Sequence, residues 1–319
     1  MLTGFMFAMT YLGSAGFSIP ALVILFWCVH PRLAARAIVV LSFGSTLNTV
    51  LKLVWHAPRP FWTDPAVRGR QPLASFGMPS GHAQNAVVTW GFFASRTRRA
   101  GVWAAAAVVI VLIGVSRVYL GVHSWGQVLA GWAIGLGVLV VALWLEPRAV
   151  PWWSRRPLVL QVAMALVISL AFLGGAWLAV RSLHGWRWPA AWAEALVAAG
   201  GHTRPITVNE AAAATGGLFG ILAGMSVLAA RGWFDAGGSL GRRLARLFVG
   251  VAGAGVLSLL DLLPGPRAGE AFAVQALLAL WATAGAPEAF VRLGLARRAP
   301  ARATPALTRP GDGRDEPAQ

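Results

Sequence analysis

Charged residues and cysteine are both scarce in this sequence. Of its 319 residues, 12% are charged and 57% are hydrophobic, whereas soluble domains carry about 25% charge. Too few polar side chains remain to cover a soluble surface, so a soluble globular enzyme is excluded. The single cysteine, Cys28, excludes an internal disulfide and a multi-cysteine metal site. The composition therefore predicts an integral membrane protein.

Nine apolar segments follow one another along the chain, with lengths near that of a membrane-spanning helix. They lack the strict alternation of barrel strands, which favours a helical bundle. The segments are Tyr11–Val29, Ala37–Trp55, Ser80–Ser95, Gly101–Arg117, Ser124–Leu145, Leu158–Val180, Glu210–Ala230, Leu244–Leu263 and Gly269–Phe290. We therefore expect an all-α integral membrane protein, a helical bundle of about nine transmembrane spans.

Basic residues outnumber acidic ones by 27 to 11, which gives a formal net charge of +16. They cluster between the apolar segments, as in cytoplasmic loops, and this disfavours nucleic-acid binding. The side that holds the C-terminus carries 18 basic residues and the other side carries 9. The positive-inside rule then predicts a cytoplasmic C-terminus and an N-terminus outside.

The outer side also carries two long polar loops, His56–Pro79 and Arg181–Asn209. The second loop contains Trp186, Trp188 and Trp192. Tryptophan is enriched where a membrane meets water. We therefore interpret these three residues as an interfacial aromatic belt.

Three polar motifs fall on this same outer side. They are Lys52-Leu-Val-Trp-His-Ala-Pro-Arg59-Pro60, Pro79-Ser80-Gly81-His82 and Ser116-Arg117-Val-Tyr-Leu-Gly-Val-His123. Lys52 is the only lysine in the chain, so its position favours a compact ammonium group. Motifs from three separate segments on one membrane face predict a shared site.

The residue types in these motifs suit an oxyanion. Lys52, Arg59 and Arg117 supply three positive charges, and arginine forks match the oxygens of a phosphate. Ser80 and Gly81 stand where a helix is expected to begin, and the unpaired N–H groups of a helix start favour an anion. The motifs therefore predict phosphate binding.

The motifs also supply two histidines, His82 and His123. One imidazole can attack phosphorus while the other protonates the leaving oxygen. A metal site on these two histidines is disfavoured, because the surrounding cations would repel a metal ion. We therefore expect hydrolytic chemistry at the site and no metal.

In spacing and order, the motifs resemble the three signature motifs of the type 2 phosphatidic acid phosphatase superfamily. Those signatures are Lys, six residues, Arg-Pro; then Pro-Ser-Gly-His; then Ser-Arg, five residues, His. The resemblance implies a phosphoric ester hydrolase that needs neither metal nor another cofactor. His123 would be the nucleophile and form a phosphohistidine, and His82 would be the general acid. The implied phosphate-binding residues are Lys52, Arg59, Ser80, Gly81 and Arg117.

One position departs from the family pattern. The family usually carries aspartate four residues after the nucleophile, where this chain has Gln127. A glutamine carbonyl can fix the imidazole tautomer but stabilises less positive charge. Three outcomes stay open: Gln127 suffices as a third catalytic residue, the enzyme is slow, or it is inactive.

Gln127 also brings the third motif close to two branches of the superfamily. The segment Ser116–Gly131 resembles both glucose-6-phosphatase and dolichyl-diphosphate phosphatase. Looser similarity to glucose-6-phosphatase lies in Leu47-Asn48, Pro60-Phe61-Trp62 and Gly216-Gly-Leu-Phe-Gly220. Glutamine at this position is therefore interpreted as a branch feature.

The resemblance implies an organisation of the whole chain. Residues 1–182 would form a six-span phosphatase core, 183–209 an outer loop, and 210–291 three additional spans. Residues 292–319 are rich in Pro, Arg and Gly, which predicts a disordered cytoplasmic tail.

The expected function is hydrolysis of a phosphate monoester or diphosphate, first of all a lipid phosphate or polyprenyl diphosphate. The expected place is a bacterial inner membrane, with the site facing the periplasm. One alternative is a sugar-phosphate phosphatase of the glucose-6-phosphatase type. Another is a non-catalytic binder or carrier of phosphate or lipid phosphate. The expected partners are a phosphorylated lipid or small phosphorylated substrate and the membrane lipids, and not nucleic acid.

Overall fold

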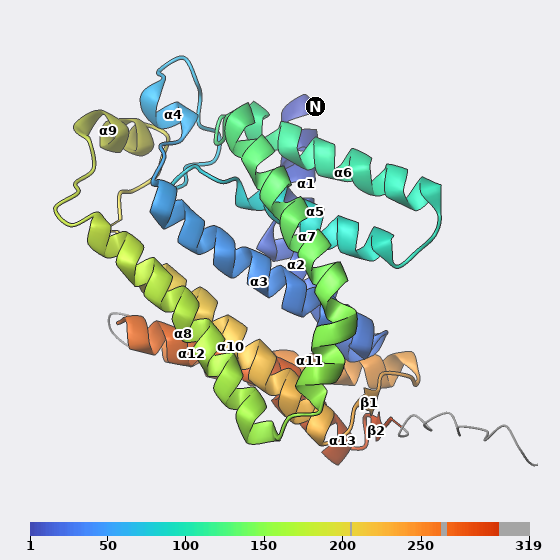
Figure 1. The fold of residues 1–319 in the computed structure, drawn as a ribbon. Helices are drawn as coiled ribbons and strands as arrows, with labels where there is room; N and C mark the ends of the chain where they lie inside the picture. Colours follow the sequence, from blue (N-terminus) through green and yellow to red (C-terminus); the bar gives the residue numbers. More distant parts are fainter. Residues whose placement is uncertain (205, 263–266, 300–319) are drawn as a thin grey trace, which may run out of the picture.

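The computed structural model describes residues 1–204, 206–262 and 267–299, and helices dominate it (Figure 1). Residues 300–319, most of the expected disordered tail, lie outside the described residues. The elements in chain order are α1 (Leu2–Leu12), α2 (Ala15–Cys28), α3 (Pro31–Trp55), α4 (Pro60–Thr63), α5 (Gly81–Ser95), α6 (Ala100–Tyr119), α7 (Trp125–Ser154), α8 (Leu158–Ser182), α9 (Ala190–Ala198), α10 (Asn209–Ala230), β1 (Phe234–Asp235), α11 (Leu240–Ser258), the 3-10 turn η1 (Leu259–Leu262), α12 (Ala268–Leu280), the π-helical turn η2 (Trp281–Gly285), α13 (Ala286–Arg292) and β2 (Arg297–Arg298).

Six helical segments in the described part of the chain are long and apolar enough to cross a membrane. They are α3 with α4, α6, α7, α8, α10 and the stretch from α12 to α13. α1 and α2 meet at 48° and would together make a seventh. α5 has 15 residues, about 22 Å of helix against the roughly 30 Å of a hydrocarbon core, and α11 carries three arginines in its first two turns. The helical membrane fold is therefore confirmed, whereas the count of nine spans is not.

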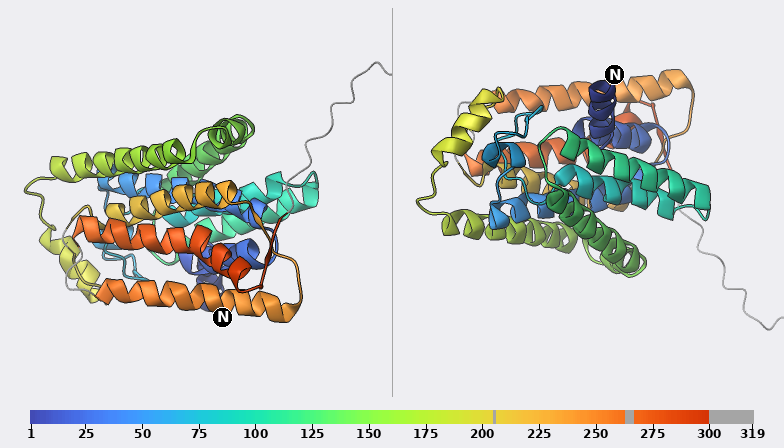
Figure 2. Two further views of the ribbon diagram at one scale, coloured as in Figure 1. Left: turned by 90° about the horizontal axis from the view of Figure 1, so that it is seen from below. Right: turned by 90° about the horizontal axis from the view of Figure 1, so that it is seen from above.

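Most helices run along one common direction, and α9 lies at one end of the bundle with the loop that carries α4 (Figure 2). At the other end, β1 and β2 form an antiparallel ribbon of two residues each. This ribbon is a small departure from the expected all-α fold. The guanidinium of Arg246 holds its turn, because it donates to the carbonyls of Asp235, Ala236 and Gly237.

Glycines bring α10 and α12 into close contact. Gly216, Gly220 and Gly224 lie four residues apart and so share one face of α10. A Cβ added to Gly216 or Gly220 would lie 2.1 or 2.3 Å from a carbonyl oxygen of α12. Small residues allow such close helix packing in lipid, where the hydrophobic effect does not drive association.

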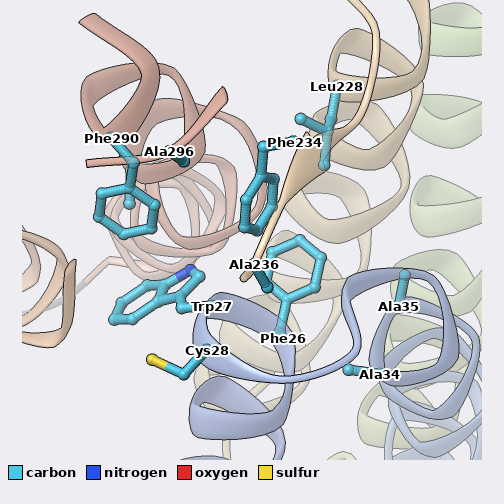
Figure 3. Close-up of a cluster of buried hydrophobic side chains, with 11 residues drawn as sticks. Phe26, Trp27, Cys28, Ala34, Ala35, Leu228, Phe234, Ala236, Phe290 and Ala296 are labelled. Carbon is cyan, nitrogen blue, oxygen red and sulfur yellow. The ribbon is translucent and has the colours of Figure 1, made fainter. Parts of the chain in front are cut away.

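A buried cluster joins the N-terminal and C-terminal parts of the chain (Figure 3). Phe26 and Trp27 at the end of α2 pack against Phe234 and Phe290, with ring centroids 5.7 Å apart in both pairs. The indole N–H of Trp27 also donates to the carbonyl of Ala282 in η2 (2.9 Å). The two parts of the chain are therefore packed as one body at this end.

Candidate active site

The three motifs meet at the end of the bundle that carries α9. Lys52 lies in the last turn of α3, and His56 ends that helix in the left-handed region at φ 35°. Ser80 caps α5, and Arg117 lies in the last turn of α6. His123 occupies the short turn between α6 and α7. Helix ends therefore supply most of the site.

Glycines on α7 let the start of α5 approach it closely. A Cβ on Gly131 would lie 2.6 Å from the carbonyl oxygen of Ser80, and one on Gly135 would lie 2.6 Å from that of Gln84. This close packing places the N–H of Ser80 3.0 Å from the carbonyl of Gln127. The second and third motifs are thus joined through the backbone.

The imidazole of His123 is held at both ring nitrogens. Nδ1 lies 3.1 Å from Oε1 of Gln127, and Nε2 lies 3.2 Å from Nη1 of Arg59. Oε1 of Gln127 also accepts from the N–H of Ser124 (3.3 Å), and its Nε2 donates to the carbonyl of Pro58 (2.8 Å). These bonds fix the amide, so Nδ1 of His123 is the donor and Nε2 keeps its lone pair.

The environment of His123 favours a neutral ring. The side chain is 3% exposed, and burial is the largest cause of a pKa well below its usual range. The charges of Arg59, Lys52 and Arg117 lower this pKa further, in that order. The bond to Gln127 acts in the opposite direction and does not reverse the shift.

Two of the cations meet at the loop before α5. Nζ of Lys52 donates to the carbonyl of Phe76 (2.6 Å), and Arg59 donates to the same carbonyl from Nη2 (3.3 Å). Arg59 also donates to the carbonyls of Ser75 (2.7 Å) and Val122 (2.9 Å). The guanidinium of the first motif is therefore fixed between the loop before α5 and the third motif.

Arg117 has N–H donors without a hydrogen-bond partner among the described residues. It is fully buried, and its Nη1 donates to the hydroxyl of Thr10 and to Oε1 of Gln71 (2.9 Å). Among the described residues, no partner meets its Nε or Nη2, and no carboxylate lies within 4 Å of Lys52, Arg59 or Arg117. Buried donors without partners are costly. They are suited to the oxygens of a bound anion.

The second motif adds the start of a helix. The Ser80 hydroxyl accepts from the N–H of Ala83 (3.4 Å), which leaves its own hydrogen free to donate. A Cβ on Gly81 would lie 3.0 Å from Oδ1 of Asn48, so only glycine fits there without a shift. His82 follows, within electrostatic reach of the three cations. All the motif residues thus lie around one positively charged site, with Gln127 beside it.

The sequence did not single out several residues that complete this site. Thr10 and Gln71 hold Arg117, and the Phe76 carbonyl joins two cations. Gln71 and Phe76 lie in the polar loop His56–Pro79, so the sequence pointed to this segment but not to these two residues within it. Thr10 gave no signal, because a threonine in an apolar helix is common in membrane proteins.

The tryptophans of the second outer loop pack inward. The ring of Trp186 lies 5.5 Å from that of Phe76, and Trp188 lies 4.9 Å from Trp62. Trp192 also contacts Trp62, at 5.9 Å. These rings hold the loop that bears the phosphate-site carbonyls, so an interfacial belt is an incomplete interpretation of them.

Comparison with known proteins finds one family in two parts of the chain. Residues 33–151 match the PAP2 superfamily, and residues 212–298 match the transmembrane extension of PAP2 superfamily phosphatases. The chain is 34% identical to phosphatidylglycerophosphatase B of Bacillus subtilis, over 41% of this chain and 68% of that protein. The chain belongs to the PAP2 superfamily of membrane phosphatases.

Two further PAP2 proteins are similar over part of their length. Lipid phosphate phosphatase delta of Arabidopsis thaliana is 32% identical over 46% of this chain, which spans only 38% of that relative. A crystal structure of a PAP2-type phosphatidylglycerolphosphate phosphatase from Bacillus subtilis is 28% identical, with a TM-score of 0.40. That match covers 46% of this chain and 77% of the other.

A cavity of about 960 Å³ borders this PAP2 site. α3, α10 and α12 form its walls with the loop before α5, and Lys52 and Phe76 lie at its edge. Neither His82 nor His123 is among the residues that line it. The cavity therefore meets the site at Lys52 and Phe76.

Proposed function

We propose that this protein is an integral membrane phosphatase that hydrolyses a phosphate monoester or diphosphate through a phosphohistidine, without a metal. The observation that carries the proposal is the buried His123, whose Nε2 lone pair faces Arg59 while Nδ1 is bound by Gln127. A neutral imidazole with its lone pair beside a fixed cation is a nucleophile at the edge of an oxyanion site. A protein that only binds phosphate has no need of this arrangement.

In the first step, Arg59 transfers its Nη1–H hydrogen bond from Nε2 of His123 to a phosphoryl oxygen, and the freed lone pair of Nε2 attacks phosphorus. The N–P bond forms, the P–O bond to the alcohol breaks, and the leaving oxygen takes a proton from His82. Lys52, Arg59 and Arg117 stabilise the charge that builds on the phosphoryl oxygens. The hydroxyl of Ser80 and the N–H of Gly81 complete the oxyanion site.

In the second step, water attacks phosphorus and gives a proton to His82. The N–P bond breaks, its electron pair returns to Nε2 of His123, and inorganic phosphate leaves. The Nδ1–H group of His123 keeps its hydrogen bond to Oε1 of Gln127 throughout, so this amide oxygen stabilises the imidazolium of the intermediate. Each cycle therefore restores both histidines.

The proposed substrate is a lipid phosphate or a polyprenyl diphosphate. The site lies at the ends of helices that are apolar enough to cross a membrane, so a phosphate could enter while its apolar tail stays in the bilayer. The relatives named lipid phosphate phosphatase delta and phosphatidylglycerophosphatase B support a lipid phosphate. A soluble sugar phosphate is the second candidate, favoured by the polar side chains Glu210, Glu270 and Gln275 in the neighbouring cavity.

We further propose how the protein sits in a bacterial inner membrane. The short α5 and the arginine-bearing α11 would complete nine spans, with the N-terminus and the site on the periplasmic side and the C-terminus in the cytoplasm. The ribbon end of the bundle carries Arg96, Arg231 and Arg298, each paired with a glutamate, while the site end binds an anion. Within this bundle, residues 1–182 would be the phosphatase core and 210–291 an extension of it.

The test is phosphate release by the detergent-purified protein in EDTA. Phosphatidic acid, undecaprenyl diphosphate and glucose 6-phosphate are offered in parallel, with His123→Ala as the blank. We expect release from at least one substrate, and a fall to background in His123→Ala with phosphate-analogue binding partly kept. Turnover that survives His123→Ala would remove the assigned nucleophile. Binding without turnover of any substrate would favour the non-catalytic carrier.

A further inference from the structure

The cavity beside the phosphate site is built jointly by the two family segments. α3 belongs to the segment that matches the PAP2 superfamily, whereas α10 and α12 belong to the transmembrane extension. The close packing of α10 on α12 through Gly216 and Gly220 fixes these two walls relative to each other. The extension therefore supplies a large part of the cavity wall, and α3 and two loops supply the rest.

The cavity wall carries acidic and amide groups close to the phosphate site. Glu210 lies in the first turn of α10, within electrostatic reach of the Lys52 ammonium. Glu270 and Gln275 face the same cavity from α12, and Arg204 lines it from the loop before α10. Carboxylates and amides accept hydrogen bonds from hydroxyl groups.

The charges of this wall disfavour a second phosphate. Once Lys52 binds the reacting phosphoryl group, Arg204 is the remaining cation among the lining residues, against Glu210 and Glu270. A diphosphate would place its second phosphoryl group beside two carboxylates, and like charges at close range repel. A neutral alcohol with free hydroxyls meets acceptors instead.

Two exposed leucines also line the cavity. They are Leu260 in η1, 36% exposed, and Leu277 on α12, 44% exposed. An acyl chain attached to the alcohol could pass these side chains and enter the bilayer. The cavity thus offers apolar contacts as well as the polar ones near Lys52.

We propose that this cavity binds the leaving alcohol of the substrate and that Glu210 selects phosphate monoesters whose alcohol bears a free hydroxyl. The inference rests on the proposed phosphatase function and names the substrate class of the same site. The hydroxyl-bearing alcohol belongs either to a lipid such as lysophosphatidic acid or to a soluble sugar phosphate.

The test compares matched substrates on Glu210→Gln. Lysophosphatidic acid has a free hydroxyl where phosphatidic acid carries a second acyl chain, undecaprenyl diphosphate adds a second phosphate, and glucose 6-phosphate is the soluble source. Glu194→Gln on α9, which is exposed and does not line the cavity, is the control. The readout is kcat/KM for each substrate, resolved into kcat and KM, in wild type and both variants.

We expect the wild type to prefer a hydroxyl-bearing monoester. Glu210→Gln should lower kcat/KM for the hydroxyl-bearing substrate relative to undecaprenyl diphosphate by about tenfold, mainly through KM, because a charged acceptor is lost and a repulsion is relieved. In the control Glu194→Gln, the ratio of kcat/KM between the two substrates should stay at the wild-type value. A response with lysophosphatidic acid identifies a lipid source, and a response with glucose 6-phosphate identifies a soluble one.

Other outcomes overturn the inference. Glu210 is not the selecting residue if the ratio of kcat/KM between substrates is the same in Glu210→Gln and Glu194→Gln. It is also not the selecting residue if the wild type prefers the diphosphate. In both cases, His123-dependent turnover still supports the phosphatase. Absence of any His123-dependent turnover removes the phosphatase and this inference with it. Gln275→Leu provides a second variant, for which the same relative loss on hydroxyl-bearing substrates is expected.

Discussion

At the scale of single residues, the expected chemistry of the site involves an amide, Gln127, at the position where the family pattern given above has aspartate. Gln127 accepts from His123 and Ser124 and donates to Pro58. A carboxylate could accept from His123 and Ser124 but has no N–H group to donate to the Pro58 carbonyl. The Gln127 Nε2 group would lie 2.7 Å from a Cβ on Gly77, so the amide also packs tightly against the loop before α5.

Gln127→Leu should impair turnover more than binding. Leucine keeps much of the volume but leaves Nδ1–H of His123 without an acceptor, so the ring loses its fixed tautomer. We expect kcat to fall by up to about 10⁴-fold, the loss seen in serine proteases when the carboxylate that orients the catalytic histidine is replaced by an amide. Steady-state kinetics check this, and an unchanged kcat would contradict the orienting role.

Gln127→Asp tests the same position in the other direction. A carboxylate can still accept from the imidazole and adds negative charge beside the phosphohistidine, so activity should be retained or rise. The same kinetic assay checks it. Complete loss of activity would indicate that the amide bond to Pro58 is the essential one.

The acid side of the pH profile should reflect the environment of His123. Its pKa is lowered, so the ring stays neutral down to a lower pH than the ordinary 6.5, and the nucleophile is lost only below that value. Histidine-labelled NMR titration, with His123→Ala to assign the signal, measures this directly. We expect a midpoint under 6.5 and an upward shift in Lys52→Met, since one repelling charge is removed. A wild-type midpoint above 6.5 would contradict this account.

At the scale of elements, the contact between α10 and α12 depends on where glycine lies on α10. Gly220 faces α12 directly, whereas a Cβ on the neighbouring Gly217 would meet nothing within 4 Å. The same helix thus offers a tight and an open glycine three residues apart. The two helices that meet at Gly220 also form two walls of the cavity beside Lys52.

Gly220→Ala should therefore destabilise the protein and Gly217→Ala should not. The added methyl at residue 220 meets the Ala276 carbonyl at 2.3 Å, and such overpacking costs about 1–3 kcal/mol. At residue 217 the gain in helix propensity, about 1 kcal/mol, is unopposed. Thermal unfolding in detergent measures both, and equal melting temperatures for the two variants would contradict the packing argument.

At the scale of the whole molecule, the two ends of the bundle differ in what their charges do. At the site end, three cations lie without acidic partners within 4 Å among the described residues. At the ribbon end, Glu288 pairs with Arg231, Arg292 and Arg298, and Glu146 with Arg36 and Arg96. We therefore expect an anion to bind at the site end, where the cations have no acidic partner, and not at the ribbon end, where the charges are paired.

Labelling of introduced cysteines should show which end lies outside. In a Cys28→Ser background, Glu194→Cys marks the site end and Arg155→Cys marks the opposite end, before α8. A membrane-impermeant maleimide should label Glu194→Cys in intact cells and Arg155→Cys only after lysis, because basic loops stay in the cytoplasm. The reverse pattern would invert the proposed orientation.

The sequence determined the class of the fold and the residues of the motifs. Hydropathy is a property of local stretches of about 20 residues, so apolar segments can be read without tertiary contacts. Each motif spans at most nine residues, so the positions of Lys52, His82 and His123 needed only their neighbours in the chain. The family membership followed from the same short patterns.

The tertiary structure alone decided which polar groups are used and which are free. Thr10 accepts a hydrogen bond from Arg117, which is 107 residues away in the sequence. Lys52 lines the same cavity as Glu210 and Gln275, which lie on helices far along the chain. Such pairings depend on how helices pack, and in lipid an apolar surface does not specify its partner. Local pattern therefore located the motif residues in the chain, while helix packing decided which of their donors stay free and formed the cavity beside them.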